Sequence, residues 1–123
     1  MKNHLTVVVL LAGFFSQPAM AQSVDKEIRV PFHFAVGKSL YEKNCGECHG
    51  MAGNGSEEGP PLMHKIYEPS HHGDESFYRA VSQGAKAHHW KFGDMKPIPE
   101  LSNRDVGKIL PYVRWLQLQH GIK

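Results

Sequence analysis

The sequence has little net charge, no convincing β-strand pattern and, beyond its N-terminus, no long apolar run. Its 123 residues carry 14 Lys and Arg against 12 Asp and Glu, for a formal net charge of +2. A nucleic-acid-binding protein normally has a strong basic excess or a basic stripe, so this balance argues against that class. No segment after residue 21 is apolar enough to span a membrane, so we expect no stable membrane insertion.

What is present indicates one soluble domain. The length is that of a single domain, and six Phe, four Tyr and two Trp can nucleate a core, which argues against disorder. Twelve Gly and eight Pro predict long loops. Only two cysteines occur, and they lie close together, so their spacing decides what chemistry they serve.

Residues 1–21 are predicted to be a secretory signal peptide that is removed after Ala21. Lys2 supplies a positive charge, residues 5–15 are apolar, and Ala19-Met20-Ala21 has the small-residue pattern of a cleavage site. An apolar segment this short does not cross a hydrocarbon core, which needs about 20 residues. The residue directly after the cut is not a cysteine, so nothing indicates a lipid anchor. We therefore expect an exported protein of a bacterial periplasm.

The most informative motif is Cys45-Gly46-Glu47-Cys48-His49. A disulfide would close a very short loop and add little stability. A redox-active dithiol usually accompanies a βαβ pattern, and a zinc site would need two more ligands at recognisable spacing. The fourth interpretation is the attachment signature of c-type haem. Thiols three residues apart on one helical turn can reach two vinyl groups of one porphyrin edge, and the next imidazole can reach the iron.

Further elements flank this motif in a characteristic order. Gly37 and Tyr41 precede it, the loop Gly59-Pro60-Pro61-Leu62 follows it, Gly93-Asp94-Met95-Lys96-Pro97 comes later, and a last helix carries Ile109 and Tyr112. In this order the chain resembles a small class I cytochrome c from about Phe34 to Ile122. The resemblance implies a single all-α domain, residues 34–123, around one covalent haem c. Residues 22–33 are then an N-terminal extension.

The resemblance also implies roles for individual residues. His49 is the expected proximal iron ligand, and the carbonyl of Pro60 is expected to accept its other imidazole N–H, which would orient the ring. Met95 is the expected distal ligand, with His88 or His89 as alternatives. His/Met ligation raises the reduction potential relative to His/His ligation.

Two other methionines are poorly placed for the distal role. Met51 is two residues from His49 and Met63 adjoins the proximal loop. Trp90, five residues before Met95, is expected to donate its indole N–H to a haem propionate or to pack as part of the pocket wall.

Three helices are expected around the site. The first runs from about Ala35 to Asn44, and Gly37 within it predicts close approach of the last helix, at Ile109 and Tyr112. The second runs near residues 75–83, with Asp74 as N-cap and Gly84 just beyond its end. The third starts after Ser102, where Ser102 and Asp105 form a capping-box pattern, and ends at about His120. Its expected buried stripe is Val106, Ile109, Val113 and Leu116.

Histidine is in excess. The chain has nine histidines, all but His4 follow the predicted signal, and a haem needs one or two. Five lie in two loops: His64, His71 and His72, then His88 and His89. They are either solvated residues and polar partners of propionates and carbonyls, or ligands of a second metal, Cu(II) or Zn(II), with Asp74 nearby.

The expected function is that of a periplasmic one-electron carrier. Both axial positions of the iron would be filled, which leaves no substrate site, so we do not expect an enzyme. The protein is expected to be a monomer that meets its redox partners transiently, with Lys91 and Lys96 available to steer an acidic partner. The alternatives are a Cu- or Zn-binding or sensor protein that uses the histidine loops, and a small haem enzyme with a labile distal ligand.

Overall fold

The computed structural model describes residues 29–123, and no β-strand occurs among them. The longer helices are α1 (Ala35–Asn44), α3 (Asp74–Gln83) and α4 (Asn103–Gln119), joined by the one-turn helix α2 (Gly46–His49) and the 3-10 turns η1 (Phe32–Phe34) and η2 (Lys65–Tyr67). The all-α prediction is confirmed. The predicted signal peptide and residues 22–28 of the predicted extension lie outside the described residues.

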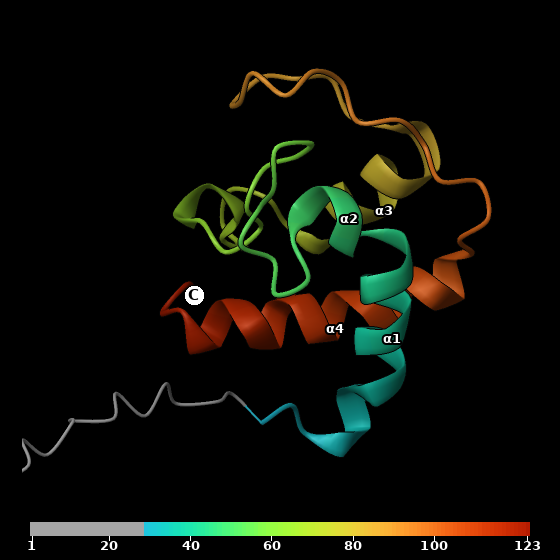
Figure 1. Ribbon diagram of the computed structural model, residues 1–123, viewed down its shortest axis with the longest axis vertical. Coiled ribbons are helices and arrows are strands. Elements are labelled where there is room, and N and C mark those ends of the chain that lie inside the picture. The colour runs from blue at the N-terminus through green and yellow to red at the C-terminus, as the bar shows by residue number, and fades with distance from the viewer. Residues whose placement is uncertain (1–28) are drawn as a thin grey trace, which may run out of the picture.

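Helices α1 and α4 cross at Gly37, and α2 lies above this crossing (Figure 1). A Cβ on Gly37 would be 2.9 Å from the carbonyl carbon of Lys108 and 3.3 Å from Cβ of Tyr112, and closer still to the Lys108 oxygen. The prediction that Gly37 permits a helix crossing is therefore confirmed. The contact falls on Lys108 and Tyr112, whereas Ile109 turns into the core.

The core forms where α1 and α4 meet the loop after α2. It consists of buried side chains from these three parts: Tyr41, Leu62, Ile109, Tyr112, Val113 and Leu116. All four residues of the predicted α4 stripe are buried. None of the helices in the part of the chain described here is long and apolar enough to cross a membrane.

The caps of α4 and α3 follow the local sequence to different degrees. At α4, the Ser102 hydroxyl accepts from the Asp105 N–H at 3.2 Å, and the Asp105 carboxylate accepts from the Ser102 N–H at 3.1 Å, so the predicted capping box is present. At α3, Asp74 is not the N-cap as predicted: Gly73 occupies that position. The Asp74 carboxylate instead accepts from Arg114 Nε at 2.9 Å.

Two side chains of α4 anchor the loop between α2 and α3. Gln117 is 1% exposed and donates from Nε2 to the carbonyls of Leu62 at 3.0 Å and Tyr67 at 3.2 Å. Arg114 donates to the carbonyls of Tyr67 at 2.8 Å and His72 at 2.6 Å. The position of this loop over the core thus depends on residues about 40 to 55 positions later in the chain.

The segment after α3 forms a second loop, residues 85–95, which projects from the body of the domain (Figure 1). Ala85 and Met95 close it by exchanging backbone hydrogen bonds of 3.0 and 2.9 Å. Gly84 leads into it with φ +78°, as expected for the residue after a helix. This backbone pairing fixes the position of the Met95 main chain at the end of the loop.

Candidate cofactor site

A cavity of about 980 Å³ lies between the helices and the two loops. This volume is at the upper end of the range for cofactor pockets. All six residues predicted for the site line the cavity: Cys45, Cys48, His49, Pro60, Trp90 and Met95. Residues separated by up to 50 positions are therefore brought to one place.

The two cysteines lie at the helical turn α2. Cys45 is its N-cap residue and Cys48 lies within it, and no disulfide joins the two. Burial, and secondarily the neighbouring Cys48, raises the pKa of Cys45 to about 11, so this thiol is protonated at neutral pH. A protonated thiol is a weak metal ligand, so Cys45 is poorly suited to bind a metal.

His49 has one ring nitrogen engaged and the other available. Its Nδ1 donates to the carbonyl of Pro60 at 2.9 Å, which is the hydrogen bond that the resemblance predicted. A carbonyl only accepts, so Nδ1 carries the proton and Nε2 keeps its lone pair. Burial lowers the pKa of His49, and the bond to Pro60 offsets this in part, so the ring is neutral at pH 7. A neutral, oriented imidazole is the form that binds a metal.

The sequence around Pro60 makes this contact sterically possible. A Cβ on Gly59 would be 2.8 Å from the carbonyl oxygen of Cys48, so only glycine lets the loop lie this close to α2. The far end of α2 is held by Tyr41, whose hydroxyl donates to the Gly50 carbonyl at 2.9 Å.

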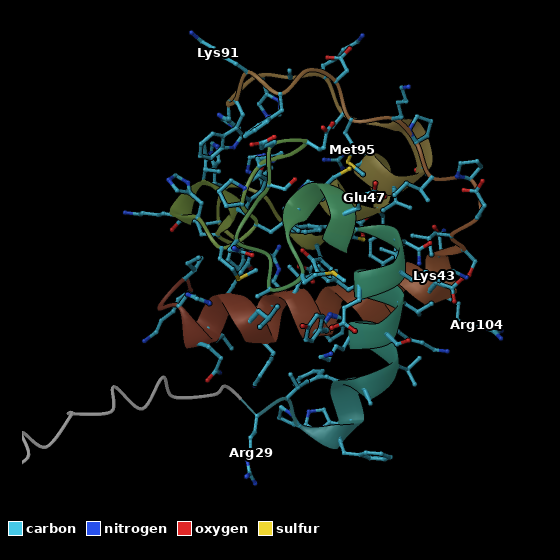
Figure 2. All side chains as sticks on the ribbon, in the orientation of Figure 1. Arg29, Lys43, Glu47, Lys91, Met95 and Arg104 are labelled. Carbon is cyan, nitrogen blue, oxygen red and sulfur yellow. The ribbon has the colours of Figure 1, made fainter. Side chains whose placement is uncertain are left out.

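Met95 reaches the same cavity from a different element. Its side chain points from the 85–95 loop toward the body of the protein (Figure 2). Met51 is 61% exposed, and Met63 packs on Gly53 and the core. Of the three methionines in residues 29–123, Met95 is the one that lines the cavity.

Trp90 has a buried polar atom with nothing to bind. Its indole Nε1 has no hydrogen-bond partner among residues 29–123, and its ring meets His64 edge-on at 5.1 Å. Tyr67 lines the same cavity, close to the indole N–H but outside hydrogen-bond geometry. Burial raises the pKa of Tyr67, and the nearby N–H lowers it in part. Tyr67 lies in no motif, so sequence reasoning missed it.

Four of the five loop histidines line the cavity, and the fifth does not. His71, His72, His88 and His89 gather at its edge, whereas Nδ1 of His64 accepts from the Ile66 N–H at 3.2 Å and caps η2. The alternative in which the loop histidines are ligands of a second metal therefore does not include His64.

Two of the gathered rings have perturbed protonation. Burial lowers the pKa of His72, and the charges of His71, His88 and Arg114 add to this. The pKa of His89 is lowered by desolvation and then by its neighbours His88, His72 and His71. Desolvation first and neighbouring like charges second therefore disfavour protonation of these two imidazoles.

Comparison with known proteins adds an independent line of evidence. The Cytochrome c family model matches residues 34–117. The Cbb3-type cytochrome c oxidase subunit CcoP of Rubrivivax gelatinosus is 29% identical over 114 residues, which are 91% of this chain and 34% of that subunit. The chain thus spans about a third of that relative's length, and no solved structure matches it. Because the family model covers more than half of the chain and every residue of the site, this protein belongs to the cytochrome c family, whose cofactor is covalently bound haem c.

Proposed function

We propose that the protein is a periplasmic one-electron carrier whose haem c is attached through Cys45 and Cys48 and ligated by His49 and Met95. Membership of the family supports electron transfer through haem. The observation that carries the finer proposal is that an oriented imidazole and a thioether, from elements on either side of α3 in the chain, line one cavity.

The donor set fits a covalent haem. Cys45 lies at the start of the helical turn α2, and Cys48 lies within that turn. Both line the cavity wall, where each thiol can form a thioether. The unpartnered N–H of Trp90 offers a donor inside the same cavity, and Tyr67 offers a second. Both donors suit a propionate, which accepts hydrogen bonds. The need is clearest for Trp90, because a buried indole N–H without an acceptor is unfavourable.

When bound, the haem supplies the Fe(III)/Fe(II) couple, and the residues of this chain set its properties. His49 would bind through Nε2, while the Pro60 carbonyl holds the ring and increases its basicity. Met95 supplies a soft sulfur that favours Fe(II) and raises the reduction potential. Apolar side chains of α4 that line the cavity, Ile109, Leu110 and Val113, exclude water.

With His49 and Met95 both as ligands, the haem iron would have no open position, which favours a carrier over an enzyme. Lys91 at the tip of the 85–95 loop points away from the body (Figure 2) and, with exposed Lys96, suits an acidic partner. Similarity to an oxidase subunit supports protein redox partners. Removal of residues 1–21 would release a monomer in the periplasm, with residues 22–33 preceding the cytochrome c domain, 34–123.

The ligation is tested by exchanging methionines one at a time in the haem-loaded protein. Met95→Ala should abolish the weak near-infrared sulfur-to-Fe(III) band, lower the reduction potential and allow cyanide to bind quickly. Met63→Ala is the matched control, because Met63 packs on the core without lining the cavity, and it should keep the band. A band that survives Met95→Ala, or that is lost in Met63→Ala, contradicts the proposal.

Attachment is tested separately by extraction. Acid–acetone should leave the haem on the polypeptide, and thiol titration should find no free thiol. Extractable haem, or two titratable thiols in the haem-loaded protein, would refute the thioether bonds to Cys45 and Cys48. Rapid cyanide binding by the unaltered protein would instead favour a haem enzyme with a labile ligand.

A further inference from the structure

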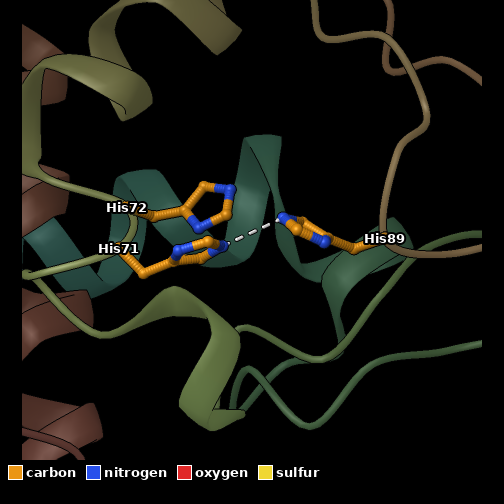
Figure 3. A group of neighbouring side chains, drawn as sticks. All are labelled: His71, His72 and His89. Carbon is orange, nitrogen blue, oxygen red and sulfur yellow. Dashed lines mark hydrogen bonds between the residues drawn. The ribbon is translucent and has the colours of Figure 1, made fainter.

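Three histidines from two loops meet at the rim of the cavity. His71 and His72 precede α3, and His89 lies in the 85–95 loop on the other side of α3 in the chain. Their ligand nitrogens all lie within 4.8 Å of one another. The rings turn toward a common point, with Nε2 of His71 and Nε2 of His89 separated by 3.3 Å (Figure 3). This arrangement brings three strong nitrogen donors together, and no carboxylate from residues 29–123 joins the group.

One of the three separations between ligand nitrogens, that between His71 and His89, matches the edge of a tetrahedral site. Zinc binds imidazole nitrogen at about 2.0–2.1 Å, and a tetrahedron with these bonds has edges of about 3.3–3.4 Å between nitrogens. The separation of 3.3 Å between the nitrogens of His71 and His89 is such an edge. Adjacent ligands in a square plane would be only about 2.8–3.0 Å apart for the same bond lengths.

We propose that His71, His72 and His89 form a second metal site, which binds one Zn(II) through three imidazole nitrogens and leaves the fourth position to water. Three protein nitrogens and one open position are an established zinc donor set. The ion would replace the single hydrogen bond between His71 and His89, in which only one of the two Nε2 atoms is a donor and the other an acceptor.

The fold holds one of these ligands in a binding orientation. Nδ1 of His72 donates to the carbonyl of Ile66 at 2.6 Å, so its Nε2 keeps a free lone pair. The main chain at the same residue is fixed because Arg114 of α4 donates to the His72 carbonyl at 2.6 Å. A hydrogen bond from the second ring nitrogen is what orients metal-binding histidines.

Neighbouring groups are excluded from the site by their own contacts. Nδ1 of His88 donates to the Lys86 carbonyl at 2.7 Å, and its nitrogens are outside the group that converges. His64 caps η2, and Asp74 is paired with Arg114. Of the five loop histidines that the sequence offered as alternative ligands, three therefore form the site.

An ion at this place would tie the loop before α3 to the 85–95 loop. That second loop also carries Met95, so zinc should stabilise the loop that supplies the proposed distal ligand. Binding that is specific to the folded protein raises its stability in proportion to the logarithm of ligand concentration over Kd. The zinc site itself is argued from the histidines alone and stands apart from the iron ligation.

The test uses the full haem-loaded chain after chelator treatment, titrated calorimetrically with zinc chloride. We expect one tight equivalent. In the double variant His71→Ala/His89→Ala both removed rings are exposed, so the fold should persist, as circular dichroism and the haem spectrum will show. Loss of a hydrogen-bond partner of a ligand alone weakens metal sites by about 10–100-fold, so loss of two ligands should weaken zinc binding by at least that factor.

His64→Ala is the matched control, because His64 lies in the same region but outside the group. It should bind zinc as the unaltered protein does, and zinc should raise the melting temperature of both but not of the double variant. Copper(II) as a second probe should give nitrogen hyperfine structure in electron paramagnetic resonance that the double variant lacks.

Weak binding of several zinc ions that persists in the double variant would overturn the proposal. So would a loss of binding in His64→Ala that equals the loss in the double variant. Neither result affects the Met95 assignment, because that assignment is read from the near-infrared band. Conversely, the calorimetric titration repeated in Met95→Ala should still show one zinc equivalent even if the iron ligation proves wrong.

Discussion

Replacing Gly37 by alanine probes the helix crossing that positions the cofactor motif. The new Cβ would be 2.9 Å from the carbonyl carbon of Lys108 and 3.3 Å from Cβ of Tyr112, and closer still to the Lys108 oxygen. The nearest obstacle is main chain of α4, which cannot rotate away as the end of a flexible side chain can. The two helices must therefore separate, and α1 leads directly into Cys45 and His49.

The expected cost follows from two opposing effects. Overpacking a tight contact costs typically about 1–3 kcal/mol, and contact with rigid main chain places this case at the upper end. Alanine in a helix is favoured over glycine by at most about 1 kcal/mol. Gly37→Ala should thus destabilise the protein by about 2 kcal/mol, which in a domain of this size lowers the melting temperature by about 8–16 °C.

Gly107→Ala is the matched control with the opposite expected sign. Gly107 is exposed in the interior of α4, and its Cβ would meet only the hydroxyl of Tyr78 at 3.3 Å, a group that can move. The substitution should stabilise the protein by about 0.5–1 kcal/mol. Thermal unfolding of the haem-loaded proteins, followed by circular dichroism at 222 nm, measures both changes. Equal melting temperatures for Gly37→Ala and the unaltered protein would refute the reasoning.

Four further predictions concern other contacts. Ser102→Ala removes the cap of α4 and should cost about 1 kcal/mol in thermal unfolding; an unchanged midpoint would show that the capping box is not stabilising. The Ser102 hydrogen bonds hold the pKa of Asp105 below its usual 3.8. The stability that the ionised Asp105 carboxylate contributes is therefore present above pH 3.8 and is lost as the pH falls through its lowered pKa. Asp105→Asn removes this titration and should make acid unfolding less steep. Gln117→Leu leaves the Leu62 carbonyl without its donor and should lower the free energy of unfolding in denaturant by about 1–3 kcal/mol. An unchanged free energy of unfolding would indicate that water hydrates this carbonyl instead. Trp90→Phe removes the unpartnered N–H and should change the pH dependence of the reduction potential; an unchanged profile would assign Trp90 to packing alone.

The parts of the fold that could be predicted are those with signals within a few residues. The limits of α1 and the capping box of α4 were predicted to within a residue or two, because caps act within one helical turn. The crossing at Gly37 was also predictable, since glycine in a helix is unfavourable unless a neighbour requires it. The cofactor motif is contiguous, so its chemistry could be inferred without knowledge of the fold.

Side chains that meet across loops could not be predicted in the same way. The local sequence makes Asp74 a good N-cap, yet its carboxylate binds Arg114, 40 residues later. In the sequence, nothing distinguishes His64 from His71 as a loop histidine. In the structure, His64 caps η2 whereas His71 contacts His89. These outcomes depend on long-range contacts, and no local pattern encodes them.

The sequence by itself determined the helical class, the helix limits and the attachment motif. Helix propensity and capping depend on residues within about one helical turn, and the residues of the attachment motif are contiguous. Only the tertiary structure decided which histidines converge and that the buried N–H of Trp90 has no partner among residues 29–123. The physical reason is the anchoring of the loop between α2 and α3 by Arg114 and Gln117 of α4. Those hydrogen bonds hold His72 where the 85–95 loop, closed by its own backbone pair, can bring His89 to it.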